Sequence, residues 1–119
     1  MNKNRLQVAC EISADAVVAA RASQHGQLEA YTARELPHGA VLPSLTEANV
    51  QRADWLRDTI KTVLDEVAGR ERDVVTILPD AAVRVALLDF ETLPEKREEA
   101  EAVVRFRLKK SLPFDVDKA

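Results

Sequence analysis

An amphipathic helical pattern followed by a short apolar run constrains the fold of this chain more than any other feature of its sequence. Apolar residues recur at the spacing of one helix face, at Leu56, Ile60, Val63, Leu64 and Val67. Gly69 is placed to end this helix in a left-handed conformation. The run from Asp73 to Asp80 then has the composition of a strand buried on both faces. A helix that returns to such a strand is a crossover connection, so we expect the strand to lie parallel to the first strand of the sheet.

Three short strands are expected before this helix. Arg5 to Ser13 and Asp15 to Ser23 are rich in small and β-branched apolar residues, and the turn Ser13-Ala14-Asp15 joins them into a hairpin. Gln27 to Leu36 alternates and should add a third antiparallel strand, which makes a meander. Pro37 to Asn49 contains two prolines and a glycine, and is expected to be a connecting loop.

The remaining segments complete an α/β order. Ala82 to Leu93 has the composition of a further strand, as an edge strand or an extended arm. A last helix should carry Pro94 in its first turn, glutamates near its start and cations near its end, which suits the helix dipole. Its expected buried stripe is Ala100, Val103, Val104 and Leu108. This order, a three-stranded antiparallel meander, a helix, a parallel strand, an extended arm and a C-terminal helix, is that of a ribonuclease H-like or actin-like ATPase half-domain.

Composition narrows the function classes. A chain of 119 residues is expected to form one domain, and its net charge of -3 lacks the basic excess of nucleic-acid binders. The single cysteine, Cys10, excludes an internal disulfide and suits a reducing compartment, where it would act as a small buried hydrophobe. No apolar run approaches the roughly 20 residues that span a bilayer, and Glu11 and Asp15 interrupt the segment that most resembles a secretory signal. We therefore expect a cytoplasmic chain. His25 and His38 lie in expected loops with no cysteine or carboxylate at ligand spacing, so no metal site is expected.

Three segments resemble one known family in the same order. Leu36 to Val50, Asp73 to Pro94 and Lys109 to Ala119 are similar to the N-terminal part of PilM-type type IV pilus assembly proteins. These are actin-like ATPase-fold proteins of the bacterial cytoplasm. The resemblance covers nearly all of the chain.

The resemblance implies a scaffolding function. The chain would bind the cytoplasmic tail of a PilN-type inner-membrane protein and contact other pilus platform and motor proteins, peripheral to the inner membrane. A related secretion platform would use the same domain. ATP with magnesium would bind between two actin-like halves in the full-length protein. Residues 1–119 would supply a single N-terminal actin-like subdomain of a truncated protein, without enzymatic activity by itself.

In a member of this family, the first hairpin would bind phosphate. Actin-like proteins carry Asp-x-Gly and often a following Lys there, and the corresponding positions in this sequence are Glu11, Ser13 and Val18. The candidate nucleotide-binding residues are Glu11, Ser13, Ala14 and Asp15. The alternative, which these departures favour, is a plain structural turn ordered by Ser13 and Asp15.

A second alternative for the chain is a metal-dependent nuclease of the ribonuclease H-like superfold. Glu11 and Asp80 are expected at the same ends of two neighbouring parallel strands, and Asp54 or Asp58 would project from the helix between them. Such carboxylates gather two metal ions in these nucleases. The competing interpretation of Asp80 is an ordinary turn residue within Pro79-Asp80-Ala81.

An apolar segment follows the last helix. Leu112, Pro113, Phe114 and Val116 would either pack against a further subdomain or help line the groove for a partner's tail. Because either role leaves apolar surface exposed on this chain alone, a homodimer or strand exchange between copies is also expected.

Overall fold

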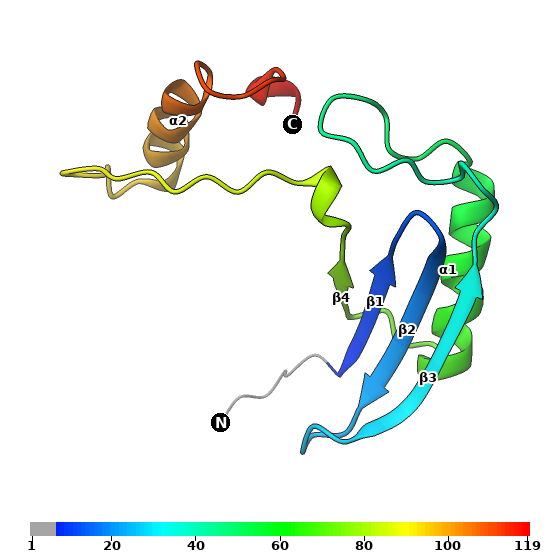
Figure 1. Ribbon diagram of the computed structural model, residues 1–119. Coiled ribbons are helices and arrows are strands. Elements are labelled where there is room, and N and C mark those ends of the chain that lie inside the picture. The colour runs from blue at the N-terminus through cyan, green and yellow to red at the C-terminus, as the bar shows by residue number, and fades with distance from the viewer. Residues whose placement is uncertain (1–6) are drawn as a thin grey trace. The chain divides into compact units, whose positions relative to one another are not determined.

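The computed structural model describes residues 7–119, so the first two residues of the strand expected from Arg5 lie outside the described part of the chain. The chain divides into two compact units, one ending at Val83 and one comprising Arg84–Ala119. The first is a sheet with one helix and the second is built on one helix (Figure 1). The protein is therefore of the α/β class, and each unit is described by itself.

A mixed four-stranded sheet forms the first unit. Its strands are β1 (Val8–Ile12), β2 (Ala16–Ala22), β3 (Leu28–Glu35) and β4 (Val74–Ile77), in the order β3-β2-β1-β4. β1, β2 and β3 form the expected antiparallel meander, and β4 pairs with β1 in parallel. The prediction of a parallel strand after a crossover helix is confirmed.

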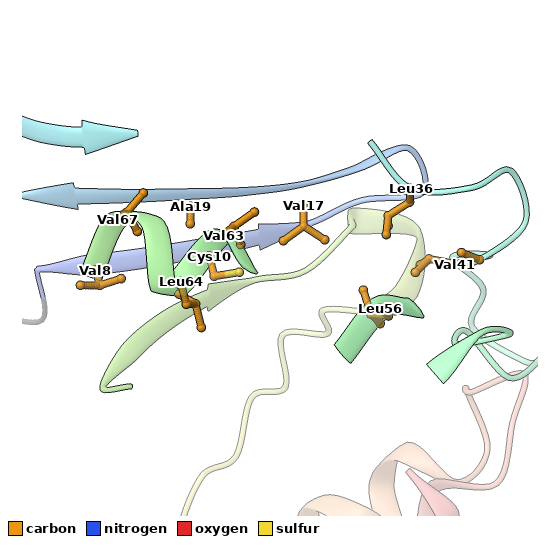
Figure 2. Packing of buried hydrophobic residues seen from close by; sticks show 11 residues of the cluster. Val8, Cys10, Val17, Ala19, Leu36, Val41, Leu56, Val63, Leu64 and Val67 are labelled. Carbon is orange, nitrogen blue, oxygen red and sulfur yellow. The ribbon is translucent and has the colours of Figure 1, made fainter. Parts of the chain in front are cut away.

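One face of this sheet is covered by α1 (Ala53–Ala68), as Figure 1 shows. Val63 and Val17 are fully excluded from solvent where the helix meets β2. Val63, Leu64 and Val67 of the helix belong to one cluster with Val8 and Cys10 of β1 and Val17 and Ala19 of β2, and Figure 2 shows these side chains together. Gly69 follows the helix with the expected positive φ of 60°, but its ψ of -114° lies outside the left-handed helical region.

The loop expected from Pro37 to Asn49 contributes more than a connection. Ala40 and Val41 are buried, and Val41 forms an isolated antiparallel bridge with Val50. In Figure 2, Val41 lies at the same end of the core as Leu56. The loop therefore closes the end of the core above the helix N-terminus, which its polar composition does not predict.

The expectation that residues 73–80 form a strand buried on both faces is wrong. Only Val74–Ile77 are strand, and Val75 and Ile77 each remain 45% exposed. Within residues 7–119, β4 is an edge strand that pairs with β1 alone, and α1 covers the opposite face from these two side chains. An apolar run indicates a buried strand only when a second layer is present to bury it.

The second unit contains α2 (Arg97–Leu108) and a 3-10 turn, η2 (Val116–Lys118). Of the two alternatives for Ala82 to Leu93, an edge strand or an extended arm, the structure has the arm, which follows the 3-10 turn η1 (Asp80–Ala82) (Figure 1). α2 begins three residues after Pro94, so this proline precedes the helix and does not lie in its first turn.

The expectation of a buried stripe on α2 is wrong in the extent of burial. Ala100, Val104 and Leu108 are half-buried, Val103 is exposed, and no residue of α2 is fully buried. The spacing correctly identified which side of the helix is apolar. The unit supplies too few other residues to cover that side.

Candidate functional site

The C-terminal unit carries a groove along the apolar side of α2. Its volume is about 390 Å³, and its apolar lining consists of Ala100, Val104 and Leu108 of the helix with Val116 and Ala119. The three helix residues are spaced four apart, so they lie in one row on the helix surface. Such a row can receive aliphatic side chains of an extended or helical peptide.

The wall of the groove opposite α2 is the turn η2, and polar contacts hold it in place. Arg105 donates from Nη1 to the carbonyl oxygen of Val116 at 3.0 Å. Lys109 Nζ lies 3.3 Å from Asp117 Oδ2, and the Asp115 carboxylate accepts a hydrogen bond from the backbone N–H of Asp117. These contacts hold the turn η2 against α2, and Val116 is buried there, with 7% of its surface exposed.

Charged side chains border the groove. Arg97 and Glu101 both line it and pair with each other, with 2.7 Å between Nε and Oε1. The Arg107 guanidinium lies 5.2 Å from the ring centroid of Phe90, in the arm that precedes the helix. The groove thus offers an apolar floor with a paired charge at its rim, which is the arrangement of an interaction surface.

The four residues expected after the last helix differ in burial. Val116 is buried, Leu112 and Phe114 are half-buried, and Pro113 is exposed. Val116 is the one of the four that lines the groove. The spacing of Ala100, Val104 and Leu108 predicts an apolar stripe, and the same spacing is the sequence signal for this groove.

The turn of the first hairpin is held by Ser13. Its hydroxyl donates to the carbonyl oxygen of Ala16 at 3.1 Å and accepts from the backbone N–H of Ala16 at 3.1 Å and of Asp15 at 3.4 Å. In a phosphate-binding loop, backbone N–H groups point at the anion. In this turn, the N–H groups of Asp15 and Ala16 donate to the Ser13 hydroxyl instead. Within residues 7–119 a positive φ occurs only at glycines, so Ser13 does not adopt the glycine-like conformation of such loops.

The carboxylates considered for metal chemistry lie on different sides of the sheet. Val8 and Cys10 face α1, so Glu11, one residue further along β1, points to the opposite face and is exposed. Asp54 and Asp58 belong to α1, and Asp54 pairs with Arg57 at 3.2 Å. Asp80 begins the turn η1, three residues beyond the strand residue that pairs with Glu11. In the described part of the chain no three potential ligand side chains gather for a metal ion.

A second hollow, which no sequence pattern predicts, lies between β3 and α1. It has a volume of about 350 Å³ and is lined by Arg34, Glu35, Trp55, Asp58, Thr59 and Thr62. Trp55 is 48% exposed, with Arg52 stacked at 5.2 Å from its ring centroid. The one tryptophan of the chain, placed on the polar side of a helical pattern, was the available signal for this hollow.

Residues 7–119 include no helix with the length and apolar character needed to cross a membrane. Neither a protein-family model nor a curated protein sequence matches the chain.

Proposed function

We propose that this chain is the N-terminal portion of a type IV pilus assembly scaffold of the PilM type, and that its C-terminal unit binds the tail of a PilN-type inner-membrane protein. The proposal rests on the sequence resemblance described above. The strand order β3-β2-β1-β4, with a helical crossover into the parallel strand, is compatible with an actin-like half-domain. The chain acts by binding, at the cytoplasmic side of the membrane, and not by catalysis.

The observation that supports the binding function best is the half-covered groove of α2. A row of three apolar side chains is open to solvent on one side and closed by Val116 on the other. A peptide of about six extended residues covers roughly 20 Å, and α2 spans about 18 Å. The groove therefore matches a short linear segment better than a globular partner.

A titration of the 119-residue chain with a synthetic peptide of the PilN-type tail tests this proposal. We expect saturable binding, and we expect Val104→Glu to weaken it at least about tenfold, which corresponds to about 1.4 kcal/mol. Ala102→Glu adds the same charge on the exposed side of α2 and should bind like the parent chain. Equal binding by the Val104→Glu and parent chains would contradict the assignment of the groove, and no binding would contradict the function.

Nucleotide binding is proposed only for the full-length protein, with ATP and magnesium held between two actin-like halves. The hairpin residues Glu11, Ser13, Ala14 and Asp15 would contribute one side of that site. The amide of Ala14, which the hydroxyl of Ser13 does not engage, is the donor that remains for a phosphate oxygen.

An amide chemical-shift titration with magnesium and then ATP tests the contribution of this half. Shifts that appear between Ile12 and Val17 only with ATP would support a phosphate contact by the hairpin. Shifts at Glu11 and Asp80 with magnesium alone would support the nuclease alternative and contradict the scaffold proposal.

A further inference from the structure

The hollow between β3 and α1 brings an exposed indole and two carboxylates together. Trp55 lines this hollow and is 48% exposed, although tryptophan is among the side chains that gain most from burial. Glu35 and Asp58 line it as well. Its volume of about 350 Å³ lies within the range of ligand sites, which is roughly 300–1,000 Å³. The hollow therefore has room for one long side chain or a small organic group.

The charges around the hollow do not balance. Arg34 is the cation among its lining residues, and its guanidinium is already engaged, because it pairs with the Glu66 carboxylate and donates to the Ala33 carbonyl oxygen at 3.0 Å. Neither Glu35 nor Asp58 forms an ion pair within residues 7–119. The hollow therefore presents negative charge next to the indole ring.

The indole already accepts one guanidinium. Arg52 lies 5.2 Å from the Trp55 ring centroid, and it lines a neighbouring hollow of about 360 Å³ but not this one. The Arg52 side chain therefore leaves the hollow between β3 and α1 open. Trp55 and Asp58 are three residues apart on α1, so their side chains are neighbours on the helix surface. A single cation in the hollow can contact both the ring and the carboxylate.

We propose that this hollow binds an arginine side chain of a partner protein, with the guanidinium stacked on Trp55 and paired with the Asp58 carboxylate. A planar guanidinium can stack on an aromatic ring and bond a carboxylate at the same time, whereas the ammonium of lysine is a compact and strongly hydrated charge. The site uses no residue of the α2 groove, so the inference is independent of the proposed function.

The exposure of the walls favours a protein partner over a free small molecule. Thr59 is the one buried residue of the lining, and the other five residues are exposed. Sites for free ligands bury about 70–90% of the ligand surface, which these walls cannot do. The surface of a protein around an inserted side chain would exclude water from the contact, and tryptophan and arginine are enriched among the residues that dominate protein interfaces.

The fluorescence of Trp55, the one tryptophan of the 119-residue chain, gives a direct binding measurement. The probe is a Gly-Ala-Arg-Ala-Gly peptide with blocked ends, compared with peptides that carry lysine or the uncharged citrulline in place of arginine. We expect a saturable change with the arginine peptide, binding at least about threefold weaker with lysine, and no saturation with citrulline. Equal binding of the arginine and citrulline peptides would overturn the proposal.

Free arginine distinguishes the two sources of a guanidinium. A site for a protein side chain recognises the guanidinium alone, so free arginine should bind no more tightly than the blocked peptide. Free arginine that binds at least tenfold more tightly would show recognition of its amino and carboxylate groups as well, and would overturn the assignment to a partner protein.

Two variants of α1 locate the site. Asp58→Asn should weaken binding of the arginine peptide by at least about fivefold, because it removes the paired charge. Asp54→Asn removes the same charge from the same helix but lines only the neighbouring hollow, so it should bind like the parent chain. Equal losses in the two variants would show that the peptide responds to the charge of the helix in general, and would overturn the assignment to this hollow.

Discussion

The two units of this protein differ in burial, although the helix of each carries apolar residues along one side. In the first unit α1 meets a sheet, and Val17 and Val63 are completely buried. In the second unit α2 also carries apolar residues at helical spacing, but the element packed against it is the short turn η2, and none of its residues is buried. The comparison teaches that an amphipathic pattern sets which side of a helix is apolar, and that the amount of burial depends on the surface available opposite it.

The largest expected effect comes from placing a charge in the two helices at equivalent apolar positions. Val63→Asp puts an unpaired carboxylate in the core and should destabilise the first unit by more than about 4 kcal/mol, which unfolds it. Val104→Asp leaves its carboxylate in contact with water and should cost less than about 1 kcal/mol. Urea unfolding followed by Trp55 fluorescence and by circular dichroism measures both variants, and similar losses would contradict the comparison.

The next effect is the protection of thiols in the two units. Cys10 is 3% exposed, and burial raises the pKa of its thiol, so both access and ionisation oppose its reaction. Labelling of Cys10 should be on the order of 100-fold slower in the folded chain than in urea, because the unit must open first. In a Cys10→Ala background, Leu112→Cys places a thiol in the second unit and should be labelled rapidly without urea.

The raised pKa of the Cys10 thiol also gives a pH dependence. Folding favours the neutral thiol, so this contribution is complete below the unfolded thiol pKa of about 8.5 and is lost as the pH rises through the higher folded pKa. The stability of the first unit should therefore fall on the alkaline side more steeply in the parent chain than in the Cys10→Ala variant. If the stability of the two chains falls equally with pH, the Cys10 thiol is not a cause of the alkaline loss of stability.

A smaller effect is expected from two serine hydroxyls. Ser13 makes three hydrogen bonds within the β1–β2 turn, so Ser13→Ala should destabilise the first unit by about 1 kcal/mol. Ser111 makes one hydrogen bond of 3.3 Å, to Leu108 at the end of α2, and Ser111→Ala should change stability by less than about 0.5 kcal/mol. Equal effects in urea titrations would show that the hairpin turn does not depend on its serine.

The smallest effect concerns an exposed carboxylate. Hydrogen bonds from Lys61, at 2.7 Å, and from Arg72 lower the pKa of the Asp65 carboxyl. The resulting stabilisation is present above the unfolded pKa and is lost as the pH falls through the folded one. A carboxyl carbon NMR titration should show the Asp65 pKa returning upward in Arg72→Gln, and an unchanged value would exclude the Arg72 contact as a cause.

Prediction from the sequence succeeded where neighbours along the chain decide the structure. The meander, α1 and the parallel strand β4 were all expected, because alternation, helical spacing and turn residues report local conformation. The burial of residues 73–80 on both faces and the burial of α2 were misjudged, since an apolar strand face and an apolar helix stripe each need a surface to cover them. For the candidate site, Val116 was anticipated, whereas its position across from Val104 required the contact between Arg105 and the Val116 carbonyl.

The sequence by itself determined the class of each element and the apolar side of each helix, since these follow from periodicity and turn chemistry over a few residues. Only the tertiary structure decided that Glu11 points away from α1, that the loop at Ala40 and Val41 joins the core, and that α2 forms one wall of a groove. These outcomes depend on contacts between residues distant in the sequence. Burial is a property of the whole assembly of elements, so no local pattern contains it.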